Sequence, residues 1–166
     1  MPLATRSGGL LLFFLLHASP LLGQDPEGVP TPESVQALTH ELAEAWVRLE
    51  ADAYLSFFAE DLVFYFDGIS VSRADFEAVV RETLQALEAS TFEITDPHIQ
   101  ILGDDAAVIS FHLREVMVLD AHRSEDFQAA MSMVWARRSG GWKVVLMHES
   151  MPSPRGEGGD GRLVVP

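Results

Sequence analysis

Hydrophobic and polar positions change their spacing along this chain, from a helical period near the start to strict alternation further on. The first regular segment begins at Thr31-Pro32-Glu33, where an N-cap residue, a proline and an early acid are typical of a helix start. Apolar residues then recur at three- and four-residue spacing, which predicts a helix with one buried face. The predicted inward positions are Val35, Leu38, Leu42, Ala45, Trp46 and Leu49.

Two further helices are predicted before most of the strands. A short helix, capped by Asp52, should carry Tyr54, Leu55 and Phe58. The segment Ser72-Arg73-Ala74-Asp75 is similar to a capping box and predicts the start of a third helix. The residues that the third helix is expected to bury are Phe76, Val79, Val80, Leu84 and Leu87.

Runs of aromatic and β-branched residues, separated by glycine and aspartate turns, predict the strands. These are Leu62–Phe66, ended by Asp67-Gly68, then about Phe92 to Leu102, Ala106 to Leu119, and a hairpin from Trp135 to Ser150 that turns at Ser139-Gly140-Gly141, with a loop containing His122 to Asp126 before it. Helices gathered on one side of these strands predict an α+β fold. We expect a cone-shaped, strongly curved antiparallel sheet, with the N-terminal helices packed on its concave side and a cavity at its mouth.

The first residues predict an exported protein. Arg6 supplies a positive charge, Leu10 to Leu16 is an apolar run too short to span a bilayer, and Leu21-Leu22-Gly23 offers a small residue for cleavage. We interpret residues 1–23 as a signal peptide, with an uncleaved membrane anchor as the alternative. The expected location is periplasmic or extracellular, with no membrane contact after cleavage.

The rest of the chain is predicted to form one domain. Residues 24–31 are a proline-broken linker, residues 32–151 the folded domain, and residues 152–166 a disordered tail. The sequence has no cysteine, which excludes a disulfide framework and a thiolate metal site. Its formal charge of −14 arises from scattered acids and disfavours nucleic acid and anionic lipid as partners.

Several segments are similar to one known family. They are Thr39 to Tyr54, Asp75-Phe76, Asp96-Pro97-His98-Ile99 with Gly103-Asp104, and the hairpin from Trp135 through Gly141-Trp142-Lys143-Val144-Val145 to His148 and Ser150. The chain resembles the SnoaL-like group of the nuclear transport factor two-like superfamily, and within it the association (hub) domain of calcium/calmodulin-dependent protein kinase, over nearly all of residues 34–151. The resemblance implies a cystatin-like cone and a homodimer or larger oligomer. It chooses no activity, since this superfamily hosts isomerases, dehydratases, cyclases, epoxide hydrolases and non-catalytic modules.

The hub domain binds small carboxylates through arginines, with a glutamate and a tyrosine nearby. Tyr54 keeps the tyrosine of that pocket. The other hub positions hold His40 in place of the glutamate, Met133 and Glu149 in place of two arginines, and either Arg114 or Leu113 in place of the third, depending on the end from which the strand is counted. The resemblance therefore does not imply a carboxylate ligand for this chain.

Glu149 is the main candidate for acid–base chemistry. Strand alternation groups Met131 with Met133 and Trp135, and it groups Glu149 with Met147 and Val145 on the next strand. A carboxylate beside this apolar wall would be desolvated, which raises its pKa and suits a general base. The alternatives are an ion pair with Arg114 or a side chain that points to solvent.

An enzyme built on these residues would use Glu149 or His112 to move a proton. Tyr54 or Tyr65 would donate to a developing oxyanion. His112 is a candidate because Arg114 shares its face, although a lone histidine on a strand is more often part of the packing.

A ligand cavity could also be lined by aromatic and sulfur-containing side chains, although at these spacings such residues are core first. The candidate ligand-binding residues are Tyr54, Tyr65, Arg114, Met131, Met133, Trp135, His40 and Trp46. The histidines show no metal-ligand spacing, and the sequence contains no phosphate loop or cofactor motif. We therefore expect neither a metal nor a cofactor.

These observations favour an exported module that binds a small, partly apolar organic molecule in its cone. The alternatives are a cofactor-free acid–base enzyme (an isomerase, dehydratase or hydrolase) and an oligomeric assembly module. A raised carboxylate pKa would favour the enzyme. Uncovered sheet faces predict a homodimer or larger oligomer, with expected interface positions Arg123, Phe127, Val144, Leu146 and His148.

Overall fold

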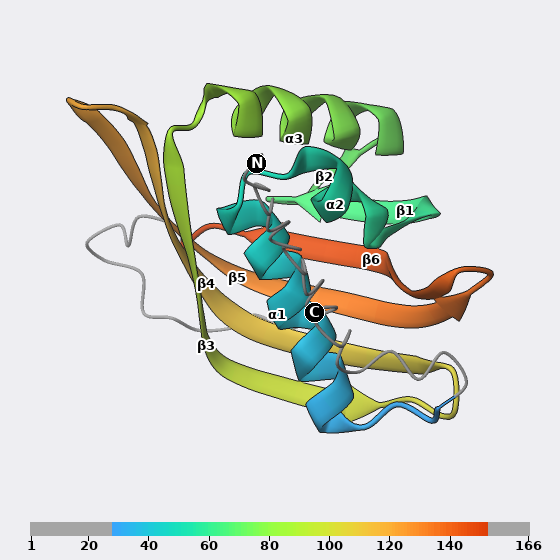
Figure 1. Cartoon of the computed structure of the whole chain (residues 1–166). Coiled ribbons are helices and arrows are strands. Elements are labelled where there is room, and N and C mark those ends of the chain that lie inside the picture. The colour runs from blue at the N-terminus through green and yellow to red at the C-terminus, as the bar shows by residue number, and fades with distance from the viewer. Residues whose placement is uncertain (1–27, 153–166) are drawn as a thin grey trace, which may run out of the picture.

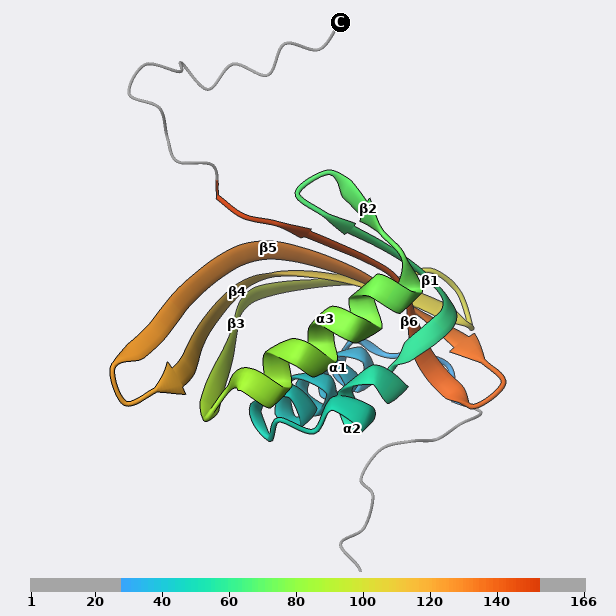
Figure 2. The same ribbon diagram turned by 90° about the horizontal axis from the view of Figure 1, so that it is seen from above.

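In the described part of the computed structural model of the protein, three helices lie on the concave side of one curved, six-stranded sheet (Figures 1 and 2). The elements are α1 (Pro32–Val47), α2 (Ala51–Ser56), β1 (Phe58–Phe66), β2 (Ile69–Val71), α3 (Arg73–Ala86), β3 (Ala89–Ile101), β4 (Ala106–Asp120), β5 (Arg123–Arg138) and β6 (Gly141–Ser150). The structure describes residues 28–152, so the predicted signal peptide, half of the predicted linker and nearly all of the predicted tail lie outside the described residues. The predicted α+β architecture is confirmed.

Side-chain caps fix the starts of the two long helices as predicted. At α1, the backbone N–H of Ser34 donates to Thr31 Oγ1 over 3.2 Å, and the N–H of Thr31 donates to Ser34 Oγ over 2.9 Å. At α3, the N–H of Asp75 donates to Ser72 Oγ over 3.1 Å. These bonds satisfy backbone donors that have no partner inside a helix.

Three details of the predicted helices are wrong. Phe58, expected on the short helix, is the first residue of β1. The N-cap of α2 is Glu50, not Asp52, and it makes no side-chain cap bond. The chain leaves α1 through a tight turn in which Leu49 has a φ of 58°, so α2 starts before Asp52 is reached. Val79 is 58% exposed instead of buried, because the inward positions of α3 are Phe76, Val80 and Leu84.

The strands follow the order β2-β1-β6-β5-β4-β3. Every neighbouring pair is antiparallel except β1 and β6, which run parallel. Figure 2 shows β3, β4 and β5 bending around α1 and α3, so that the helices occupy the hollow of the sheet. The last strand of the chain therefore lies inside the sheet, between the first and the fifth strands.

Two strands are longer than predicted because their partners extend them. β1 begins at Phe58, which pairs with Val144 of β6. The predicted loop from His122 to Asp126 is wrong, since pairing between β4 and β5 continues to Asp120 and Arg123. The Asp67-Gly68 turn between β1 and β2 is confirmed, and both of its residues have positive φ.

The β5–β6 register shifts once, and this changes which residues of β6 face the helices. Val134 pairs with Leu146 but Trp135 pairs with Val144, so Val145 is an extra residue in the ladder. The predicted common face of Val145 with Met147 and Glu149 is therefore wrong. Val144, which was expected at an oligomer interface, is instead fully buried in the core.

The core lies between α1 and the middle of the sheet. Trp135 and Met133 are fully buried there. The indole Nε1 of Trp135 donates to Thr39 Oγ1 over 3.2 Å, and that hydroxyl donates to the carbonyl of Val35 over 2.8 Å. Trp135 and Met133, predicted as candidate ligand contacts, are therefore packing residues of the core.

Candidate functional site

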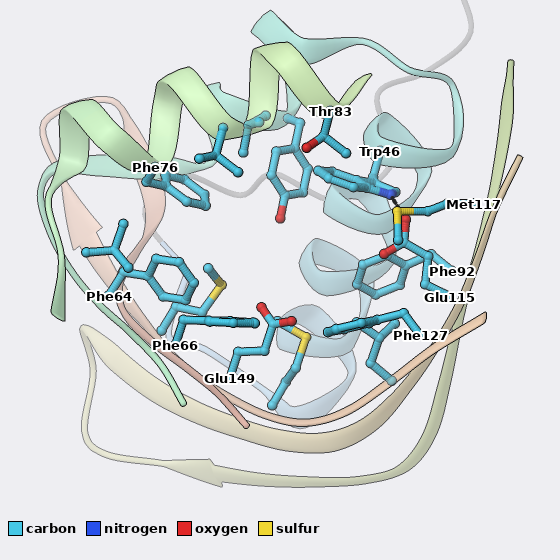
Figure 3. Close-up of a pocket in the computed structure, with 17 residues that line it drawn as sticks. Trp46, Phe64, Phe66, Phe76, Thr83, Phe92, Glu115, Met117, Phe127 and Glu149 are labelled. Atoms are coloured by element: carbon cyan, nitrogen blue, oxygen red, sulfur yellow. Dashed lines mark hydrogen bonds between the residues drawn. The ribbon is translucent and has the colours of Figure 1, made fainter. Parts of the chain in front are cut away.

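A cavity of about 400 Å³ lies between the helices and the concave face of the sheet (Figure 3). This volume is within the range of small-molecule sites in proteins. Its lining is mostly aromatic and aliphatic: Trp46, Tyr54, Phe64, Phe66, Val71, Phe76, Val79, Val80, Thr83, Phe92, Leu113, Glu115, Met117, Phe127, Met131, Met147 and Glu149.

Strand pairing places the two acids of the lining on neighbouring parts of the sheet. Glu149 of β6 is paired with Phe66 of β1 on one side and with Met131 of β5 on the other. Glu115 of β4 is paired with Phe127 of β5 on one side and with Phe92 of β3 on the other. Because side chains alternate between the faces of a sheet, these registers direct both acids toward the helices.

The carboxylate of Glu149 points into the cavity from the sheet, between Phe66 and Phe127 (Figure 3). Within residues 28–152, no side chain or backbone group forms a hydrogen bond with this carboxylate. Burial raises the pKa of Glu149 to about 7, and the nearby charges of Glu115 and Asp67 act in the same direction. Glu149 therefore changes its protonation state near neutral pH.

Glu115 occupies the other wall and is only 5% exposed. Its carboxylate accepts hydrogen bonds from Trp46 Nε1 and, over 2.8 Å, from Ser90 Oγ. Burial raises the pKa of Glu115, and these two hydrogen bonds oppose that shift. This acid holds the indole of Trp46 in the cavity wall, whereas Glu149 is left available to a ligand.

Tyr54 is the third polar group of the site, at 4% exposure. Its ring packs against Trp46 and Phe58, with centroid distances of 4.9 and 5.1 Å. Burial and the charges of Glu149 and Glu115 raise the pKa of Tyr54, so its hydroxyl stays neutral. In the described part of the chain, nothing is hydrogen-bonded to this hydroxyl.

Four of the predicted site residues line the cavity together: Tyr54, Trp46, Met131 and Glu149. Of the two residues that could face the cavity from β4, Leu113 lines it and Arg114 is exposed on the opposite face. Arg114 donates to Asp126 over 2.8 Å, so the alternative of an ion pair with Glu149 is wrong.

The remaining predicted site residues lie elsewhere. His112 alternates with Leu113, is exposed, and borders a separate small hollow that also includes Ser150. His40 is exposed on α1, because its neighbour Thr39 takes the buried position. Tyr65 is 40% exposed and points away from the cavity, between two inward phenylalanines of β1. Met133 and Trp135 belong to the core.

Glu115 is the functional candidate that sequence reasoning missed. Its signal is present in the alternation of β4, where Ile109, Phe111 and Leu113 are buried on the same face two residues apart. An acid that continues such an apolar face should lie inside the fold. Phe127, an expected interface position, lines the cavity, and its place at an oligomer interface stays a prediction.

The described residues 28–152 contain no group of three or more histidine, cysteine or acidic side chains arranged to hold a metal ion. No helix within this range is both long enough and apolar enough to cross a bilayer.

The fold is that of nuclear transport factor two-like proteins, among them a solved structure from Streptomyces avermitilis that is 18% identical, with a TM-score of 0.62 over 73% of this chain and 95% of the other. A family model described as the SnoaL-like domain matches residues 35–154, and the chain belongs to this family.

Solved structures with the same fold share little sequence with the chain. A proposed calcium/calmodulin-dependent protein kinase II association domain from Xanthomonas campestris is 20% identical, with a TM-score of 0.63 over 77% of this chain and 96% of the other. A proposed aromatic ring hydroxylase from Novosphingobium aromaticivorans is also 20% identical, with a TM-score of 0.63 over 72% and 87%. A proposed scytalone dehydratase from the same organism has a TM-score of 0.65 at 9% identity, over 72% and 83%. At these identities the likeness shows the fold alone.

Proposed function

We propose that this protein binds a small, largely apolar organic molecule in the cavity between its helices and its sheet. The observation that carries the proposal is the cavity of about 400 Å³, lined by aromatic and aliphatic side chains with a few polar groups among them. Such a lining buries an apolar skeleton and orients it through a small number of polar contacts. The prediction of a signal peptide at residues 1–23 supports a location outside the cytoplasm for this binding.

A neutral fluorescent probe tests whether the cavity accepts such molecules. N-phenylnaphthylamine should gain fluorescence with the native protein, because it leaves water for an apolar site. Thr83→Trp adds bulk to the cavity lining on α3, whereas Gln85→Trp places the same side chain at an exposed position of the same helix.

The expected result is saturable fluorescence with the native protein and Gln85→Trp, and its loss with a folded Thr83→Trp. Circular dichroism checks the fold of each variant. The absence of a saturable signal with the native protein would contradict the proposal. So would a signal as strong as that of the native protein in both Thr83→Trp and a second lining variant, Leu113→Trp.

Proton-transfer catalysis is a second candidate function, because the pKa of Glu149 is raised to about 7. A base with this pKa is matched to neutral pH. Glu149 would remove a proton from the bound molecule, and the neutral hydroxyl of Tyr54 would donate a hydrogen bond to the oxygen on which negative charge develops. His112 takes no part, since it lies outside the cavity. Cofactor-free isomerases and dehydratases use chemistry of this kind.

Nitrobenzisoxazole is a suitable probe for such a base. Removal of its ring C–H proton by a carboxylate breaks the N–O bond and releases a coloured cyanonitrophenolate. We expect a rate that rises with pH through about 7 and is lost in Glu149→Gln. Glu125→Gln removes an exposed acid outside the cavity and is the matched control. Equal rates in the two variants would assign the reaction to another group.

A further inference from the structure

All of the charge in the cavity lining is negative. Among residues 28–152, Glu115 and Glu149 are the only carboxylic acids of the lining, and no arginine, lysine or histidine lines it. A ligand carboxylate or phosphate would enter an apolar space in which both nearby charges repel it. The charge of the lining therefore disfavours the binding of anions.

The polar groups left over in the cavity suit a ligand that donates hydrogen bonds. The two carboxylate oxygens of Glu149 and the hydroxyl of Tyr54 have no hydrogen-bond partner within residues 28–152, although Tyr54 is only 4% exposed. Glu115, in contrast, is occupied by Trp46 and Ser90. An alkylammonium group has three donors and no acceptor, which matches the two carboxylate oxygens and the phenolic oxygen.

Aromatic rings surround this set of acceptors. Figure 3 shows Phe66 and Phe127 on either side of Glu149, with Trp46 and Phe92 on the adjoining wall. The faces of such rings attract a cation, and the attraction is stronger where water is excluded. The same rings accommodate the apolar part of a ligand.

A neutral ligand would leave the charged form of Glu149 buried without a counter-ion. A buried carboxylate without a partner is unfavourable in its charged form, and it must take up a proton or acquire a counter-ion. A cationic ligand supplies that counter-ion, because its charge compensates Glu149 directly.

We propose that the ligand of this cavity is a small lipophilic amine, bound in its protonated form with its nitrogen against Glu149 and Tyr54 and its apolar part among the aromatic rings. This inference rests on the proposed cavity binding and deepens it by naming the ligand class.

Three probes with one skeleton test the charge preference: naphthylmethylamine, naphthylmethanol and naphthylacetate, each titrated into the full-length protein by calorimetry. We expect the amine to bind at least roughly tenfold more tightly than the alcohol, and the acid to bind most weakly. In Glu149→Gln the amine should lose that advantage while the alcohol keeps its affinity. Glu125→Gln, which removes the same charge outside the cavity, should behave as the native protein.

Proton release gives a second measurement that needs no variant. Besides burial, the charges of Glu115 and Asp67 raise the pKa of Glu149, and the charge of Glu149 in turn raises the pKa of Tyr54. Binding of an ammonium group should ionise Glu149, so at a pH of about 6 the amine should displace up to one proton, whereas the alcohol should displace none. Titration in two buffers with different enthalpies of ionisation measures this release.

The outcomes separate the two proposals. If the alcohol binds as tightly as the amine, or if the amine releases no proton, the amine inference is overturned while cavity binding stands. If none of the three compounds binds and N-phenylnaphthylamine also fails, the proposed binding function fails, and the inference fails with it.

Discussion

Replacing Glu149 by glutamine should make the protein more stable at high pH than at low pH, relative to the native chain. The pKa of this carboxyl is about 7 in the folded state, against an ordinary value of 4.5. The native state thus holds the proton more tightly than the unfolded chain, so the contribution of Glu149 favours folding below 4.5 and is lost as the pH rises to about 7. The difference corresponds to at most about 3 kcal/mol.

Glutamine occupies nearly the same volume and carries no charge at any pH. The free energy of unfolding of Glu149→Gln, minus that of the native protein, should therefore increase by up to about 3 kcal/mol between about pH 4 and about pH 8. Taking the difference at each pH cancels the titration of groups that the substitution leaves unchanged.

Urea unfolding followed by circular dichroism at several pH values measures this difference. Glu125→Gln is the matched control, since it removes an exposed carboxylate and should give a flat difference. A flat difference for Glu149→Gln as well, or one that falls as the pH rises, would refute the claim that the cavity destabilises the charged form of Glu149.

Two further predictions concern the scaffold around the site. Thr39→Val removes the acceptor of the buried Trp135 indole and should lower the free energy of unfolding, measured with urea, by about 1–3 kcal/mol. Thr39→Ser keeps the hydroxyl and should lower it less. Equal losses in the two variants would show that the hydrogen bond is not the cause. Ser72→Ala removes the cap of α3 and should cost about 1 kcal/mol in the same assay, compared with no resolvable change for the exposed Ser70→Ala on β2.

Local signals in the sequence predict most of the fold. Thr31 and Ser72 mark helix starts through caps that need only neighbouring residues, and these predictions hold. The start of α2 depends on the left-handed turn at Leu49, which no residue preference indicates. The parallel pairing of β1 with β6 joins segments far apart in the sequence, and a local pattern cannot specify such a pairing.

The site can be predicted only where the sequence indicates which residues of each strand face the helices. Counting along β4 from its two ends gives two answers for the inward residue, and a slip of one position exchanges Leu113 with Arg114. The same ambiguity hid Glu115, which shares the face of Leu113. Glu149 lies at the cavity as predicted, although its predicted common face with Val145 is wrong, because Met147 and Glu149 both lie beyond the bulge and keep their common face.

β6 is the last strand to leave the ribosome, yet it lies between β1 and β5. Until it inserts, the β1–β2 hairpin and the β3–β5 meander have no strand to join them. Pairing between the distant segments β1 and β6 must overcome loop-closure entropy before it gains contacts, so we expect it to form later than the local β5–β6 hairpin. Glu149 arrives on the same strand, so a nascent chain that stops short of Gly141 lacks both a continuous sheet and the free carboxylate of the cavity. Completion of the cavity lining therefore depends on the strand that is synthesised last.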